Sequence, residues 1–326
     1  MAGKVPPEVL ERILSKIRSN DPRVLIGPGI GIDVSAVSFG ERTLVASTDP
    51  ITGAVEDIGY YAVHINANDV ATSGARPRWF LVTLLLPEGE ERLAGKIMGQ
   101  IASEAGKLGV SVIGGHTELT PGLSRPIVVG TMLGEVDGRP LSSAGARPGD
   151  AIVMTKWAGL EGTSIIARER REELATAFGR SFVERAESLA EYLSVVDEAL
   201  YAAAFGANAM HDPTEGGVAN GVHEMADAAG LGFRLYTEGI PIREETEKIC
   251  SFYGLNPLAL MGSGSLLIAV PRDAARLLVE RLLARGIKAT LVGEFLAEKK
   301  RVAIRNGDEL PFKRPKADEL WKLFKA

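Results

Sequence analysis

The chain has 326 residues, of which 45% are hydrophobic and 24% charged, and this composition excludes a disordered, collagenous or coiled-coil protein. The formal net charge is −5, and the longest basic run is three residues, 299–301. We therefore expect no nucleic-acid and no anionic-membrane partner, because both need a concentrated positive surface. The longest apolar runs, such as residues 80–86, are far shorter than the roughly 20 residues that span a bilayer.

The number of cysteines limits which disulfides and metal sites the chain can form. Cys250 is the only cysteine, which excludes an internal disulfide and a cysteine-based zinc site. The first residues predict an amphipathic helix without the apolar stretch of a signal peptide. These features favour a reducing, cytoplasmic location, with Cys250 as a packed structural residue.

The first half of the chain predicts an α+β domain. Hydrophobic periodicity predicts helices and strands that alternate in the order β-β-α-β-α-β-β, which is a ferredoxin-like rhythm. A glycine-rich loop at 27–31 follows the first helix, and a second loop is expected over 114–126. The predicted helices are 7–19, 57–72 and 92–108, and the predicted strands are two within 35–47, then 79–86, 110–113 and 127–136.

A Gly/Pro/Ser-rich segment at 142–150 marks a domain boundary. We therefore predict an N-terminal domain of residues 1–145 and a C-terminal α/β domain of residues 146–326. In the second domain the predicted helices are 162–171, 181–204, 216–229, 243–252 and 272–283, and the predicted strands are 151–155, 232–236, 265–270, 288–296 and 300–305.

Polar residues cluster beside glycines, in segments that predict loops, where catalytic groups usually lie. Separate carboxylates that meet in one place repel one another unless a cation lies between them. Magnesium takes oxygen ligands and usually brings a nucleotide phosphate, while glycine-rich backbone offers N–H groups to phosphate oxygens. The five clusters are residues 31–33, 47–50, 66–69, 114–118 and 211–217.

Each cluster also has a structural interpretation, as turn residues, helix caps or buried hydrogen bonds. The chain has no Walker loop, no GxGxxG after a strand and no GxSxG, which disfavours P-loop, Rossmann and standard hydrolase enzymes. Of the four histidines, His64 and His223 are expected to pack on helices, whereas His116 and His211 lie in polar clusters.

The order and spacing of GIDVSAV, STDP, NANDVATSGARPRW, GGHTE and HDPTEGGVANGVHEMADAAG resemble the aminoimidazole-ribonucleotide (AIR) synthetase superfamily, nearest to its HypE hydrogenase-maturation branch. The resemblance extends from about Gly27 to Glu294. It implies a two-domain PurM-like fold, with a ferredoxin-like N-terminal domain that pairs with a second copy into a dimer β-barrel. It also implies ATP and Mg²⁺ in the cleft between the domains.

The resemblance assigns roles by motif. The glycine-rich loop and the N-terminal helix would cover the site. Catalysis would fall to Asp69, Asp212 and His116. The metal ligands would be Asp33, Asp49, Asp69 and Asp212, and the cofactor-binding residues Gly31, Thr48, Asn68, Gly114, Gly115, Thr117, Gly216 and Gly217.

Two departures from the family pattern matter. Relatives usually carry Asp or Glu where this chain has His116, and neutral imidazole is a poor magnesium ligand, so Glu118 is a candidate substitute. HypE carries a carbamoyl group on a C-terminal cysteine, whereas residues 320–326 contain none, so a reaction on the chain's own tail is not expected.

The predicted function is that of an ATP-dependent, magnesium-requiring enzyme that activates a substrate oxygen by phosphoryl transfer. Its partners would be ATP, an unidentified small-molecule or protein acceptor, a second copy of the chain and other hydrogenase maturation proteins. Two alternatives stay open: a small-molecule kinase of the thiamine-monophosphate kinase type, and a non-enzymatic nucleotide-binding maturation partner.

Overall fold

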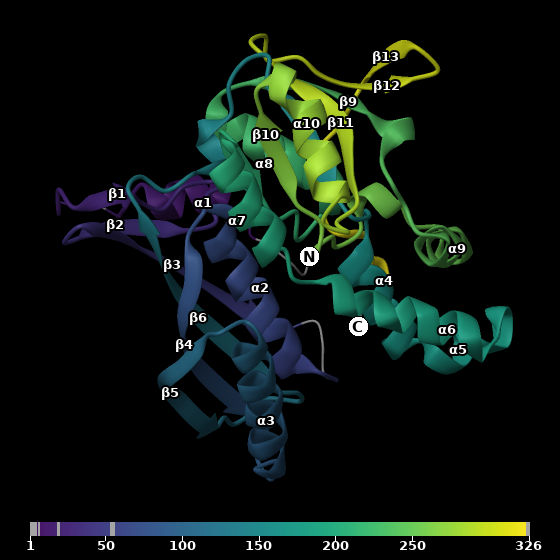
Figure 1. The fold of residues 1–326 in the computed structure, drawn as a ribbon. Helices are drawn as coiled ribbons and strands as arrows, with labels where there is room; N and C mark the ends of the chain where they lie inside the picture. The colour runs from purple at the N-terminus through teal and green to yellow at the C-terminus, as the bar shows by residue number, and fades with distance from the viewer. Residues whose placement is uncertain (1–4, 6, 18–19, 53–55, 324–326) are drawn as a thin grey trace.

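Two sheets organise the computed structural model, which describes residues 5, 7–17, 20–52 and 56–323 (Figure 1). The N-terminal sheet has six strands in the order β1-β2-β3-β6-β4-β5, and the C-terminal sheet has seven in the order β13-β12-β9-β11-β7-β10-β8. Residues 138–150 connect them. The N-terminal elements are α1 (Pro7–Leu14), β1 (Val24–Ile26), β2 (Ser35–Phe39), β3 (Arg42–Ile51), α2 (Ile58–Thr72), β4 (Arg76–Leu86), α3 (Arg92–Lys107), β5 (Ser111–Leu119) and β6 (Ile127–Asp137).

The C-terminal unit mixes helices and strands, with helices on both sides of its sheet (Figure 1). Its strands are β7 (Ala151–Thr155), β8 (Ala209–His211), β9 (Gly232–Tyr236), β10 (Leu267–Val270), β11 (Ala289–Leu296), β12 (Arg301–Arg305) and β13 (Asp308–Pro311). Its helices are α4 (Leu160–Glu169), α5 (Arg171–Phe178), α6 (Arg180–Glu187), α7 (Val196–Phe205), α8 (Gly217–Ala229), α9 (Glu244–Tyr253) and α10 (Arg272–Leu283), and the 3-10 turns η1 to η5 are Ser143–Gly145, Ser188–Tyr192, Thr237–Gly239, Pro257–Ala259 and Glu319–Lys322.

Helix α2 lies between the two units and packs against both. Fourteen of its 15 residues are buried, because it packs on β3 and β6 on one side and on α7 and β8 on the other. A helix that is buried all round carries polar residues inside the protein only where they have a role. Asn68 and Asp69 in its last turns are therefore held at the junction of the two units.

Two sequence predictions about this fold are wrong. The segment 114–118 is not a loop, because β5 runs to Leu119 and pairs in parallel with β4, leaving only 120–126 before β6. The predicted helix 181–204 is broken into α6, η2 and α7. Around this break, the carbonyl of Leu193 accepts a hydrogen bond from Asn68, and those of Tyr192 and Ser194 accept from Lys156.

Smaller differences concern the ends of the chain and short strands. Helix α1 ends at Leu14, before the predicted residue 19, and residues 18 and 19 lie outside the described part of the chain. Strands β1, β8 and β13 have three or four residues, too few for a period of two to register. No helix in the described part of the chain is long and apolar enough to cross a membrane.

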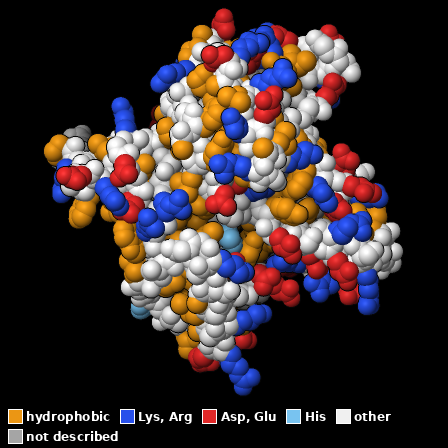
Figure 2. All heavy atoms as spheres, in the orientation of Figure 1, with side chains coloured by type: hydrophobic (Ala, Val, Ile, Leu, Met, Phe, Trp, Pro, Cys, Tyr) orange, Lys and Arg blue, Asp and Glu red, His pale blue; other side chains and the backbone are white. Residues whose placement is uncertain are grey.

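The surface view shows no large area of one charge. Figure 2 shows Asp and Glu side chains mixed with Lys and Arg over the helical arm that contains α5 and α6. This mixture agrees with the small net charge of −5 and with the absence of a long basic run in the sequence.

Candidate functional site

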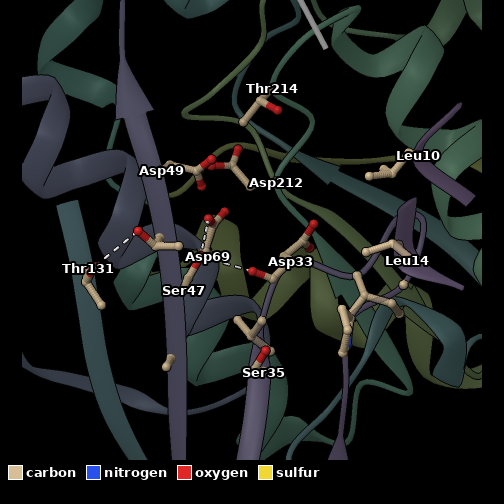
Figure 3. A pocket seen from close by; sticks show the side chains of 16 residues that line it. Leu10, Leu14, Asp33, Ser35, Ser47, Asp49, Asp69, Thr131, Asp212 and Thr214 are labelled. Carbon is tan, nitrogen blue, oxygen red and sulfur yellow. Dashed lines mark hydrogen bonds between the residues drawn. The ribbon is translucent and has the colours of Figure 1, made fainter. Parts of the chain in front are cut away.

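A cavity of about 400 Å³ lies where α1, the glycine-rich loop, β3 and the turn after β8 meet. One wall is acidic, and the opposite wall is apolar (Figure 3). Among the described residues that line it, none is lysine or arginine. The acidic wall consists of Asp33, Asp49, Asp69 and Asp212, the apolar wall opposite includes Leu10 and Leu14, and the apolar side chains of Pro28, Ile32 and Val34 also line the cavity.

Asp69 is the most enclosed carboxylate of the acidic wall. It lies on α2 and is 6% exposed, and the Ser47 hydroxyl donates a hydrogen bond of 2.8 Å to its Oδ2. Burial, followed by the nearby carboxylates of Asp49, Asp33 and Asp212, raises the pKa of Asp69 well above its usual value. This crowding of like charges is the condition that a bound cation relieves.

Asp212 approaches the same space from the C-terminal unit. Asn68 Nδ2 donates to its Oδ2 at 3.1 Å, while its Oδ1 is buried and has no hydrogen-bond partner among the described residues. Burial raises the pKa of Asp212 to about 7 although the Asn68 hydrogen bond opposes the shift. A buried oxygen without a partner is costly, so this atom is suited to bind a ligand.

Asn68 itself is fully engaged by the protein. Its Nδ2 also donates to Leu193 O at 2.8 Å, and its Oδ1 accepts from Val195 N at 2.8 Å. The side chain is buried, and it holds Asp212 and the break before α7 at the domain junction. These contacts place Asn68 behind the carboxylate rather than in the cavity lining.

The four aspartates fit a hard divalent cation. Carboxylate oxygens are the ligands that magnesium prefers, and the free Asp212 oxygen and the crowded Asp69 both gain from a positive charge. In the described part of the chain, no group of three His, Cys, Asp or Glu side chains is already arranged as a complete metal site. A metal would therefore be completed by ligands such as phosphate oxygens and water.

His211 links Asp33 to the C-terminal unit. Its Nδ1 lies 2.8 Å from Asp33 Oδ2, and its Nε2 lies 3.0 Å from Glu224 Oε2 on α8. Burial alone would lower the pKa of His211, but the two carboxylates outweigh it and raise the value to about 10. The ring is 1% exposed, so this contact lies behind the cavity wall.

Three predicted cofactor-binding glycines are not among the residues that line the cavity, and two of them have packing reasons for being glycine. Gly31 has a φ of +69°, and an added Cβ would lie 2.8 Å from the Glu224 carbonyl oxygen. A Cβ on Gly217 would lie 2.3 Å from Leu260 O. The amide of Gly216, a predicted cofactor-binding residue, already donates to Asp318 Oδ2 at 2.5 Å.

Thr48 borders the cavity on β3, next to Asp49. Its hydroxyl donates to Gly130 O at 2.7 Å and accepts from Thr131 at 3.1 Å. Thr48 is exposed and lines the cavity, which agrees with its predicted place beside the cofactor.

The residues of the GGHTE motif are not brought to this cavity in the same chain. Gly114, Gly115, His116 and Thr117 lie on β5, at the edge of the N-terminal sheet. Gly115 approaches β4 so closely that an added Cβ would lie 1.8 Å from the Val82 carbonyl oxygen. The His116 side chain is 65% exposed and lies 3.4 Å from Glu118 Oε2.

Sequence reasoning missed several residues that shape the site. Ser47 precedes Thr48 in a predicted cluster but has no predicted role, and for Leu10 and Leu14 the sequence predicts only that their helix covers the site, not that these two side chains line the cavity. Glu161, at the start of α4, is 4% exposed and lies close enough to Asp212 for the two charges to interact. Nothing in the sequence indicates that Glu161 lies near the site, because a single acidic residue at the beginning of a helix is common.

The comparisons with known proteins agree with this architecture. The model of the AIR synthase related protein N-terminal domain matches residues 25–136, and that of the C-terminal domain matches residues 147–305. A Methanocaldococcus jannaschii protein named for hydrogenase expression or formation is 30% identical over 93% of this chain and 91% of its own length. Carbamoyl dehydratase HypE of Rhizobium leguminosarum is 31% identical over 91% of this chain and 84% of its own length.

Solved structures share the fold. The structure of hydrogenase maturation protein HypE in complex with ATP covers 93% of this chain and 90% of its own, with a TM-score of 0.68 and 25% identity. The ThiL structure with AMPPCP and TMP covers 95% of each chain, with a TM-score of 0.74 and 21% identity. The chain has the two-domain PurM-like fold and belongs to the AIR synthase related family, on its HypE-like side.

Proposed function

We propose that this chain binds ATP with Mg²⁺ in the four-aspartate cavity and transfers the terminal phosphoryl group to an oxygen atom of an acceptor, in a HypE-like maturation reaction. One observation carries the proposal. The cavity offers four carboxylates and no described lysine or arginine, so a phosphate can bind there only with a cation between it and the protein.

The two walls of the cavity suit the two ends of a nucleotide. Asp33, Asp49, Asp69 and Asp212 would hold magnesium, which neutralises charge on the phosphates when it is bound. The apolar wall, with Leu10 and Leu14 of α1, gives a base or sugar a surface away from water. Protein groups then act mainly by positioning, and phosphoryl transfer needs no strong protein nucleophile.

Relatives support the same assignment. A similar structure is a HypE in complex with ATP, and the sequence relatives include carbamoyl dehydratases named HypE.

The acceptor is not Cys250, because that residue is 2% exposed and burial raises the pKa of its thiol to about 12. We place the acceptor on another molecule, which is either a small molecule or a maturation partner.

Titration calorimetry with ATP tests the proposal. With Mg²⁺ present we expect binding at least about 100-fold tighter than in EDTA, since roughly 2.7 kcal/mol of phosphate binding would depend on the cation. Equal affinity with and without Mg²⁺ would overturn the assignment. ATP turnover with carbamoylated thiol peptides, compared with thiamine monophosphate, then separates the maturation reaction from the kinase alternative, and binding without any turnover favours the non-enzymatic alternative.

We also propose that the chain functions as a homodimer. Strand β5 is a sheet edge, and eight of its nine residues are exposed, including Ile113 and Leu119. An edge of this kind is a template for pairing with another chain. Pairing there would place the GGHTE residues at an interface, where Glu118 and His116 could act on the partner's site.

The variant His116→Ala tests this placement. The ring is 65% exposed and its described polar contact is to Glu118, so the free energy of unfolding should change by less than about 0.5 kcal/mol. Loss of ATP turnover in a stable variant, measured with the dimer fraction by ultracentrifugation, would support a role at the interface. Unchanged turnover in a dimer would remove His116 from the catalytic residues.

A further inference from the structure

We propose that His211 and Glu224 form a clamp that docks the glycine-rich segment 27–33 on the C-terminal unit. Asp33 then lines the cavity only while this contact is closed. His211 is thus a positioning residue that acts on the site through Asp33. The inference rests on the proposed metal–nucleotide function where it concerns binding, but the docking itself can be measured without ligand.

The first observation is the path of hydrogen bonds across the junction. Asp33 lies between β1 and β2 of the N-terminal unit, whereas His211 ends β8 and Glu224 lies on α8. The imidazole spans the two carboxylates, at 2.8 Å from Asp33 Oδ2 and 3.0 Å from Glu224 Oε2. Because both ring nitrogens are used, the ring can neither turn nor shift without losing a contact.

The second observation is the fit of Gly31 against the same helix. Its φ of +69° and the 2.8 Å that would separate an added Cβ from Glu224 O show that the loop backbone lies directly on α8. Gly27, in the same segment, would place a Cβ no nearer than 3.9 Å to Val24 and has no left-handed conformation. Of these two glycines, Gly31 is therefore the one whose backbone approaches α8 closely, and it lies beside the clamp.

Two serine hydroxyls also hold Asp33, and one of them contacts the same carboxylate oxygen as His211. Ser143 donates to Asp33 Oδ2 at 3.4 Å, and Ser47 donates to the Asp33 carbonyl oxygen at 3.0 Å. His211 and Ser143 both contact Oδ2, so the remaining carboxylate oxygen, Oδ1, is left for a ligand in the cavity that Asp33 lines. Opening the clamp would move this oxygen together with Pro28, Gly29 and Ile32, which belong to the same segment and also line the cavity.

Hydrogen–deuterium exchange of the ligand-free, full-length chain tests the docking. His211→Asn should speed exchange in peptides over residues 24–34 at least about tenfold, and Glu224→Gln should speed it less. The matched control is His223→Asn, a buried histidine of α8 that packs on Phe233 and Phe312 and should leave these peptides unchanged. Gly31→Ala should also speed exchange, whereas Gly27→Ala should not.

Mn²⁺ binding in the presence of ATP, followed by electron paramagnetic resonance, tests the link to the site. His211→Asn should weaken Mn²⁺ at least about tenfold, and the double variant with Glu224→Gln should be no weaker than His211→Asn alone, since Glu224 acts through the ring. Unchanged exchange in both His211→Asn and Gly31→Ala, or additive losses in the double variant, would overturn the clamp. If the wild type binds neither Mn²⁺ nor ATP, the proposed function fails, while the exchange experiment still decides the clamp.

Discussion

Asp69→Asn is expected to lose magnesium-dependent ATP binding by about 100-fold while leaving the metal-free protein at least as stable as the wild type. The two effects have one cause. Burial, followed by the three neighbouring carboxylates, raises the pKa of Asp69 well above its usual value. Neutralising it removes repulsion in the empty site and also removes a negative charge that a cation would need. The Ser47 hydroxyl can still donate to the amide oxygen.

Calorimetry with Mg²⁺ and ATP, paired with urea denaturation in EDTA, measures both effects. Asp137→Asn is the matched control, because Asp137 ends β6 of the N-terminal sheet, on which α2 packs, and its side chain is 92% exposed. The control should change neither quantity. An Asp69→Asn protein that binds Mg²⁺ and ATP like the wild type would show that Asp69 is not a metal ligand.

Glu161→Gln is expected to stabilise the protein at neutral pH by about 3 kcal/mol. Burial, together with the charges of Asp212 and Asp318, raises the pKa of Glu161 from 4.5 to about 8 although Ser263 opposes the shift. Between these two values the folded state keeps a proton that the unfolded state has released. The free energy of unfolding of the wild type therefore falls as pH rises from 4.5 to 8, and glutamine abolishes this loss.

Urea denaturation in EDTA at pH 4.5, 6, 7 and 8 checks this prediction. The difference between Glu161→Gln and the wild type should be near zero at pH 4.5 and should grow up to pH 8. Glu280→Gln on α10 is the control, because the Glu280 side chain is 56% exposed and its described ion pair is with Arg276, one turn away. A difference that stays constant with pH, or a destabilised variant at pH 7, would contradict the assigned shift.

The parts of the fold that follow from local patterns were predicted well. Strand 232–236 and helix 272–283 have the predicted bounds, because each combines a clear period with a glycine or proline at its start. The three residues of β8 were missed although all are buried, since so short a run carries no period. The break in helix 181–204 was also missed, because contacts with Asn68 and Lys156, distant in the sequence, occupy its carbonyl groups.

The candidate site also has features that follow from the sequence and features that only the structure shows. The sequence by itself determined the motifs, their order and the family that they resemble, and it singled out Asp33, Asp49, Asp69 and Asp212 before any contact was known. It also showed that only one thiol is present and predicted that Cys250 is packed inside the protein, and the structure confirms that this residue is buried.

Only the tertiary structure decided which polar segments meet. The four aspartates come from a loop, a strand, a helix and a turn of two units, and the packing of α2 between both sheets brings them around one cavity. Residues 114–117 carry a motif as distinct as the others, yet sheet order places them on the outer edge at β5. Motifs are local, whereas the strand order and domain packing that direct side chains depend on contacts between distant residues.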